Sequence, residues 1–215
     1  MFYPTIKRLG DILISLVLII FFSPLLLLVA VLIKITDGGE VFLSDPKRIG
    51  LNGKEFFMYK FRTMIPNAHQ EIMNNQKYKK EKKEWLKNGG KLRLKDDPRI
   101  TRIGKIIRAI DIDELPQLIN VLKGEMSIVG PRPTYHYEVE RYLKKNPDKS
   151  PLVEAMWAVK PGITGLWQVS GRNDISFEQR IEMDAKYAQD YDLILDLGIF
   201  LQTPYVVFTR KGAYE

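Results

Sequence analysis

The hydrophobic positions fall into one long block near the start of the chain and several short periodic runs after it. From Ile12 to Ile33, 19 of 22 residues are apolar, and only Ser15, Ser23 and Pro24 interrupt the block. A helix of this length spans about 33 Å, which matches a bilayer hydrocarbon core of about 30 Å. The block is too long for the apolar region of a signal peptide, and no A-x-A-like cleavage site follows it. We therefore expect residues 1–36 to be embedded in a membrane.

The Ser23-Pro24 pair lies at the centre of this block. Proline bends or breaks a helix, and a serine hydroxyl can satisfy a carbonyl that the proline frees. Each half is then about 17 Å long, roughly half the bilayer. Lys7 and Arg8 precede the block and Lys34 follows it, which favours a re-entrant helix-break-helix hairpin with both ends cytoplasmic. A kinked helix that spans the membrane is the alternative, because prolines also occur in those.

The rest of the chain, residues 37–215, has the pattern of a mostly helical α+β domain with a small β-hairpin or sheet. Strand-like runs at 41–43 and 55–59 are separated by Asn52-Gly53, a hairpin turn signal. The apolar stretch 193–209 is either core or an interfacial amphipathic helix. Further helices are expected at 67–87, 99–109, 112–122, 134–146 and 176–190.

Composition narrows the class of protein. The 215 residues contain no cysteine, which excludes a disulfide scaffold, a Cys-based zinc site and thiol catalysis. The length suits one domain, and 45% hydrophobic with 27% charged residues exclude wholesale disorder. Outside the apolar block the hydrophobic share is about 40%, a value typical of a soluble domain.

Charge is distributed unevenly around the formal total of +7. Residues 47–108 carry 18 basic and 6 acidic side chains, whereas residues 109–215 carry 12 and 16. A basic middle third indicates an anionic partner, either phospholipid, phosphorylated substrate or nucleic acid. The lysine-rich run at 77–95 is either a solvated helix face or a contact with anionic lipid headgroups.

The densest polar cluster surrounds Asp113 and Glu114. At a helix N-terminus, both carboxylates can turn toward a cation, while Arg108 and Arg99 are placed to hold a phosphate or a carboxylate. An acidic helix cap is the structural alternative. Asp111 and Asp113 also form a DxD pattern, as in metal-binding glycosyltransferases or aspartyl phosphohydrolases, but no clear strand precedes it.

Two loops also carry candidate binding residues. Arg132 lies between two prolines, which suits a fixed anion contact or simply a rigid turn. Residues 160–172 combine three glycines with Trp167, Gln168 and Arg172. Such a loop lets backbone approach a ligand closely, and its tryptophan either stacks on a base or is buried.

The two histidines, His69 and His136, have no partner pattern, and we expect both at the surface. With so little histidine and no cysteine, a bound metal is expected to be a hard, oxygen-ligated ion, Mg²⁺ or Mn²⁺.

Taken in order, several segments resemble the bacterial sugar transferase family, the monotopic phosphoglycosyl transferases. Residues 165–168 and 210–214 are most similar to the catalytic domain of undecaprenyl-phosphate galactose phosphotransferases. Glu125 departs from the family pattern, which usually has Asp there. The segments that carry the resemblance are Ser23-Pro24, 60–64, 97–101, 113–117, 120–127, 129–133, 161–165 and 171–173.

This resemblance implies transfer of a hexose-1-phosphate from a UDP-sugar to undecaprenyl phosphate, with release of UMP. Asp113 would be the nucleophile that forms an aspartyl phospho-sugar. Glu114 would help hold Mg²⁺ with Asp113, or act on a proton of the incoming phosphate. Arg108, Arg99 and Arg132, with Lys60 and Arg62, would bind phosphates, and Gln168 and Arg172 would bind the nucleotide or the sugar.

The implied enzyme has residues 1–36 as a monotopic membrane hairpin and residues 37–215 as a membrane-associated catalytic domain. It would lie on the cytoplasmic face of the bacterial inner membrane, bind anionic phospholipid, and initiate exopolysaccharide or O-antigen synthesis. We expect no nucleic-acid partner. The sugar, the glycan pathway and the oligomeric state, including a homodimer, stay open. The rival hypotheses are a DxD glycosyltransferase that releases UDP, and a membrane-anchored basic scaffold that binds nucleic acid or lipid.

Overall fold

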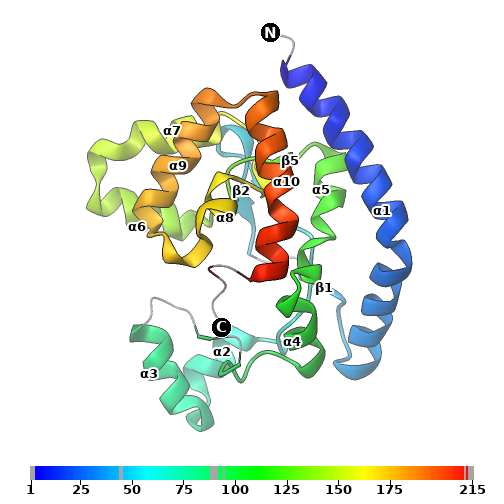
Figure 1. Cartoon of the computed structure of the whole chain (residues 1–215). Helices are drawn as coiled ribbons and strands as arrows, with labels where there is room; N and C mark the ends of the chain where they lie inside the picture. Colours follow the sequence, from blue (N-terminus) through cyan, green and yellow to red (C-terminus); the bar gives the residue numbers. More distant parts are fainter. Residues whose placement is uncertain (1–2, 44–45, 88–91, 94, 211, 213–215) are drawn as a thin grey trace.

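A computed structural model describes residues 3–43, 46–87, 92–93, 95–210 and 212. Most of the C-terminal stretch 210–214 therefore lies outside the described residues. Among those described, one helix is long and apolar enough to cross a membrane, namely α1 (Tyr3–Thr36). In Figure 1, α1 runs along one side of the molecule, while α6 (His136–Lys145), α7 (Ser150–Trp157) and α9 (Phe177–Asp190) lie on the other.

Helix α1 continues through Pro24, where a break into two helices was expected. Pro24 has no N–H to donate to the Ile20 carbonyl, and the Ser23 hydroxyl donates to that carbonyl instead, at 2.8 Å. The predicted rescue by Ser23 is thus confirmed. Figure 1 shows that α1 bends near its middle and wraps around the domain, so the proline bends the helix without ending it.

Both ends of α1 are attached to the same domain. In the C-terminal half, Val29 and Ile33 are buried against Phe61 and Ile107. In the N-terminal half, α1 packs on α5 (Gln117–Lys123) and β5 (Ser127–Val129). The helix is therefore anchored on both sides of its bend.

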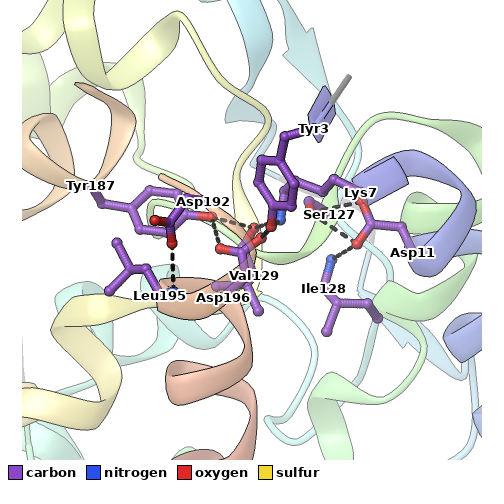
Figure 2. Close-up of polar contacts among 10 residues, drawn as sticks. All are labelled: Tyr3, Lys7, Asp11, Ser127, Ile128, Val129, Tyr187, Asp192, Leu195 and Asp196. Atoms are coloured by element: carbon purple, nitrogen blue, oxygen red, sulfur yellow. Dashed lines mark hydrogen bonds and ion pairs between the residues drawn. The ribbon is translucent and has the colours of Figure 1, made fainter. Parts of the chain in front are cut away.

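The N-terminal attachment is polar and centres on Asp196 (Figure 2). Lys7 forms an ion pair with Asp196, and the hydroxyls of Tyr3 and Tyr187 donate to the same carboxylate. The Lys7 ammonium also donates to the Val129 carbonyl at 2.9 Å. These contacts join the first turns of α1 to α10 (Leu193–Thr209) and to the end of β5.

Asp11 completes this attachment one turn further along α1. Its buried carboxylate accepts hydrogen bonds from the Ser127 hydroxyl at 2.8 Å and from the Ile128 N–H at 2.9 Å. A buried charge is costly unless it is hydrogen-bonded, and Asp11 meets that requirement through β5. The start of α1 is thus fixed to the strand that leads toward Arg132.

The described residues contain three two-stranded sheets. β2 (Arg48–Ile49) and β3 (Glu55–Phe56) are antiparallel, and Asn52 and Gly53 between them have positive φ values of 55° and 75°. The expected hairpin turn at Asn52-Gly53 is confirmed, but it joins β2 to β3 and not the run 41–43 to 55–59. β1 (Phe42–Leu43) therefore pairs with β4 (Lys60–Phe61), which corrects the expected pairing of 41–43 with 55–59.

The third sheet is parallel and was not predicted. It pairs β5 with β6 (Gly162–Thr164). A Cβ added to Gly165 would lie 2.1 Å from the Gly130 carbonyl oxygen, and one added to Gly162 would lie 2.1 Å from the Gly130 nitrogen. These glycines let two segments of the chain approach each other closely, which accounts for glycine at positions 162 and 165.

The remaining helices follow the predicted order with shifted ends. The stretch 67–87 divides at Asn75, whose side chain caps the short turn Gln76–Tyr78, and α7 and α8 were missed. His69 and His136 are exposed, as predicted. The other described helices are α2 (Ala68–Asn74), α3 (Lys79–Lys87), α4 (Arg102–Ala109) and α8 (Leu166–Ser170).

Candidate active site

The predicted carboxylates Asp113 and Glu114 share one cation, Lys60. The Lys60 ammonium lies 2.9 Å from Asp113 Oδ2 and 3.0 Å from Glu114 Oε1. Asp113 is only 2% exposed. The structure therefore brings together three of the predicted site residues from β4 and from the 3₁₀ turn η3 (Ile112–Glu114).

Burial and charge act differently on the two carboxyls. Burial raises the pKa of Asp113, although attraction to Lys60 opposes the rise. Burial also acts to raise the pKa of Glu114, but attraction to Lys60, Arg132 and Arg48 outweighs it and lowers that pKa to about 2. The pKa of Lys60 is raised, because Asp113 and Glu114 outweigh its burial. Lys60 and Glu114 are therefore charged at neutral pH, while Lys60 limits the rise in the pKa of Asp113.

A second group of contacts positions Lys60. Asn120 on α5 is fully buried, and its amide oxygen accepts the Tyr59 N–H at 2.9 Å. Its amide nitrogen donates to the Phe57 carbonyl and to Glu125 Oε2, both at 2.7 Å. Asn120 thus holds the backbone directly before Lys60. Glu125 thus accepts a hydrogen bond from the Asn120 amide.

A pocket of about 570 Å³ opens beside this cluster. Its size is typical of a small-molecule site. Its apolar wall includes Phe22, Leu25, Ile110, Ile112, Leu115, Ile163, Val169, Val206, Val207 and Phe208. Its polar lining includes Asp111, Glu114, Arg132, Gln168, Arg172, Asn173 and Arg210. Asp113 is not among the lining residues, whereas its neighbour Glu114 is.

The bend of α1 contributes to this pocket. Phe22 and Leu25 flank Ser23-Pro24, and both line the pocket opposite residues from the last turns of α10. A ligand in the pocket would therefore contact the central part of the membrane helix as well as charged groups of the domain. This arrangement suits an amphiphilic ligand with an anionic head and an apolar tail.

Arg132 is held at the pocket by residues behind it. Its guanidinium lies over the Trp167 ring at 5.3 Å, and Arg180 lies over the same ring at 5.3 Å. Arg180 donates to the Arg132 carbonyl at 3.1 Å and pairs with the fully buried Asp184 at 3.4 Å. Burial raises the pKa of Asp184 to about 6 against the attraction of Arg180. Trp167 is mostly buried and also lines the pocket, so its ring supports both arginines at the pocket wall.

The other predicted residues divide into those near the pocket and those away from it. Arg172 and Gln168 line it, and Arg108 is close enough to lower the pKa of Asp113. Arg99 is buried and makes two hydrogen bonds to Asp97, at 2.8 and 2.7 Å. Arg62 donates to the Gly38 carbonyl.

Arg99 and Arg62 are thus committed to contacts within the protein and do not line the pocket. The two aspartates of the DxD pattern also have separate partners. Asp111 pairs with Arg172 at 2.8 Å, whereas Asp113 pairs with Lys60. No shared site for one metal is therefore formed by that pattern.

The described residues contain no group of three or more His, Asp or Glu side chains arranged for a metal. Asp113 and Glu114 still offer two adjacent carboxylates. Mg²⁺ is commonly held by one or two carboxylates together with substrate phosphates. The pair therefore fits a metal ion that the substrate itself helps to bind.

Sequence reasoning missed Asn120, Arg180 and Asp184 as parts of the site. Asn120 had a usable signal, because an amide inside the apolar run 118–122 requires buried partners. The spacing of Arg180 and Asp184, four residues apart in a helix, indicates an ion pair. Nothing in the sequence indicates that this pair lies behind Arg132.

Comparison with known proteins identifies the family. The bacterial sugar transferase family matches residues 2–210. The chain belongs to this family. This bacterial sugar transferase is 42% identical over 211 residues to the exopolysaccharide production protein ExoY of Sinorhizobium fredii. The aligned region covers 97% of this chain and 88% of that protein.

Two further relatives of this sugar transferase are named for their reactions. The undecaprenyl-phosphate galactose phosphotransferase of Salmonella typhimurium is 42% identical over 212 residues, which cover 97% of this chain and 42% of that protein. The UDP-N-acetylgalactosamine-undecaprenyl-phosphate N-acetylgalactosaminephosphotransferase of Aeromonas hydrophila is 37% identical over 217 residues, which cover 98% and 45%. The chain thus spans less than half the length of both.

Proposed function

We propose that this bacterial sugar transferase moves a hexose-1-phosphate from a UDP-sugar to undecaprenyl phosphate and releases UMP. The observation that carries the proposal is the ion pair of Asp113 with Lys60 beside a pocket that is lined by arginines, among them Arg132, and by an apolar wall. The two relatives named as phosphotransferases act on undecaprenyl phosphate with different sugars. Their names support the lipid acceptor and leave the sugar open.

The proposed chemistry proceeds in two displacements. A carboxylate oxygen of Asp113 attacks the phosphorus that bears the sugar, the bond to the bridging oxygen breaks, and UMP leaves. The product on the protein is an aspartyl phospho-sugar. A phosphate oxygen of undecaprenyl phosphate then attacks the same phosphorus and frees Asp113. Because Asp113 is buried, binding of the donor would have to move Lys60 or η3 so that the carboxylate can reach the phosphorus.

The surrounding residues would divide the work by charge. Arg132 and Arg172 would bind phosphate oxygens in the pocket, while Lys60 would favour the carboxylate form of Asp113 and attract the incoming diphosphate. The low pKa of Glu114 favours a role as a cation ligand over a role as a proton acceptor. A Mg²⁺ or Mn²⁺ ion held by Asp113 and Glu114 would supply positive charge to the diphosphate.

The apolar wall of the pocket supports a lipid acceptor. Undecaprenyl phosphate has an anionic head and an isoprenoid tail, and the pocket lining combines Arg132 with apolar side chains such as Phe22, Leu25 and Phe208. The head would then lie among the arginines while the tail follows α1 and α10. A soluble sugar acceptor would gain nothing from that wall.

We also propose that α1 is re-entrant and that the catalytic domain lies on the cytoplasmic membrane surface. Both ends of α1 pack on one domain. If α1 crossed the bilayer, that domain would have to lie on both sides of the membrane. α4 and α10 would lie at the interface. Their exposed apolar side chains are Ile106, Ile110, Leu193, Ile194, Leu197, Leu201, Tyr205 and Phe208.

The deciding experiment measures nucleotide release from a panel of UDP-sugars with undecaprenyl phosphate in membranes or detergent. UMP release with one sugar, and its loss in Asp113→Asn, are expected. Quenched wild type exposed to labelled donor alone should carry the phospho-sugar on Asp113. Release of UDP, or full activity of Asp113→Asn, would contradict the proposal.

A further inference from the structure

Asp111 and Arg172 join two walls of the pocket. Arg172 Nη2 lies 2.8 Å from Asp111 Oδ2. Asp111 precedes η3, which carries Asp113 and Glu114, and Arg172 begins η5 (Arg172–Asp174) after α8. Both residues line the pocket. The ion pair therefore connects the turn with the candidate nucleophile to the loop on the other side.

Both partners have an unusual backbone. Asp111 has φ 53° and Arg172 has φ 50°, in the left-handed region. Aspartate tolerates this region comparatively well, because its short polar side chain can form local hydrogen bonds, whereas the long arginine side chain does not. Residues in such conformations persist where their surroundings fix them, and they cluster at ligand sites. The backbone thus directs the Arg172 side chain to this position at some cost in stability.

The pair is more open to solvent than the other ion pairs near the site. The Asp111 side chain is 39% exposed, while the Asp113 and Asp97 side chains are each 3% exposed. An accessible ion pair is weak because water screens it. A phosphate group offers arginine two parallel charge-assisted hydrogen bonds and more negative charge than a carboxylate. A phosphate that enters the pocket can therefore replace Asp111.

We propose that Asp111 is a positioning residue that holds Arg172 ready at the pocket and is displaced from it by a phosphate group of the substrate. Asp111 then competes with the ligand for the same guanidinium and so lowers the affinity for it. The inference rests on the proposed function for its ligand class, a phosphate-bearing substrate. That phosphate belongs either to the nucleotide donor or to the prenyl acceptor.

The test is Asp111→Asn, which removes the charge and keeps a residue that suits the left-handed backbone. Binding of UDP and of a short-chain prenyl phosphate is measured separately by calorimetry with the full chain in detergent. We expect one of them to bind about two- to fivefold more tightly to Asp111→Asn than to wild type. Tighter UDP binding assigns the phosphate to the donor, and tighter prenyl phosphate binding assigns it to the acceptor.

The double variant Asp111→Asn/Arg172→Gln separates this mechanism from a general change in charge. Arg172→Gln should weaken binding of that same ligand, and adding Asp111→Asn to it should change nothing further. A gain in affinity that persists without Arg172 would overturn the inference. So would unchanged or weaker binding of both ligands by Asp111→Asn.

These outcomes do not depend on turnover. If no UDP-sugar yields UMP, the proposed reaction fails, yet the binding comparison still reports on Asp111 and Arg172. If UMP is released but Asp111→Asn binds both ligands no better than wild type, the reaction stands and this inference fails.

Discussion

The amide of Asn120 bridges the backbone on both sides of Met58, since it donates to the Phe57 carbonyl at 2.7 Å and accepts the Tyr59 N–H at 2.9 Å. Asn120 belongs to α5, so a side chain from one helix holds the backbone of the segment between β3 and β4. Lys60 follows at once in the chain, so its position relative to Asp113 depends on Asn120.

Asn120→Ala should destabilise the protein and reduce its activity. The Phe57 carbonyl and the Tyr59 N–H lose their part-buried partner, and Glu125 keeps only its ion pair with Lys123, so the loss is about 1 kcal/mol for each of the three hydrogen bonds. Thermal unfolding in detergent should show a loss of several degrees, with UMP release lowered in the folded fraction. Asn75→Ala, at an exposed turn, is the matched control and should have a smaller effect on stability and none on activity.

Lys60→Met should shift the pH dependence of the reaction. Lys60 lowers the pKa of Asp113 against the effect of burial, so its removal lets that pKa rise further and leaves less carboxylate at neutral pH. We expect kcat/KM to fall about 10²- to 10³-fold and the acidic limb of the pH–rate profile to move to higher pH. Lys60→Arg keeps the charge and should keep the limb near its original place. An unmoved limb in Lys60→Met would argue against Asp113 as the nucleophile.

Asp184 should make the stability depend on pH between about 4 and 6. Its native pKa is raised to about 6 from 3.8 in the unfolded chain, so the native state binds its proton more tightly. That stabilisation is complete below pH 4 and is lost as the pH rises through 6. The stability of wild type relative to Asp184→Asn should fall by about 2 kcal/mol from pH 4 to pH 7.

Chemical denaturation at several pH values measures this difference. Asp148→Asn, on the exposed turn Pro147–Lys149, is the control, and its stability should follow the wild-type curve. Parallel curves for wild type and Asp184→Asn would show that the carboxyl titrates normally in the folded protein.

The re-entrant arrangement of α1 can be tested by labelling, because the chain has no native cysteine. Single cysteines at Thr5 and Thr36, both exposed near the two ends of α1, should react with an impermeant maleimide from the cytoplasmic side only. A cysteine at Leu27, in the apolar part, should react from neither side. Labelling of Thr5 and Thr36 from opposite sides would establish a crossing helix instead.

The sequence predicted those parts of the molecule that depend on local patterns. The apolar block became α1, and the Asn52-Gly53 signal became a hairpin turn. The pairing of β1 with β4 and the parallel pairing of β5 with β6 were not predictable in this way, since each joins segments with helices or a hairpin between them. Such pairings are decided by packing across the whole domain.

The candidate site shows the same division. Asp113, Glu114 and Arg132 stand in distinctive local sequences, and the structure brings them near Lys60 and the pocket. Arg99 has an equally distinctive sequence, yet its guanidinium is bound by Asp97 two residues away. A motif identifies which residues matter, but the partner of a charged side chain is settled only by the three-dimensional arrangement.

The ion pair of Lys7 with Asp196 joins residues 189 positions apart, which has a consequence for the order of assembly. During synthesis, α1 emerges long before α10, so the carboxylate that binds Tyr3 and Lys7 does not yet exist. The apolar part of α1 can enter the membrane in that interval, whereas its first turns must stay hydrated. α10 therefore completes the attachment of α1, so this part of the fold cannot form until α10 has been made.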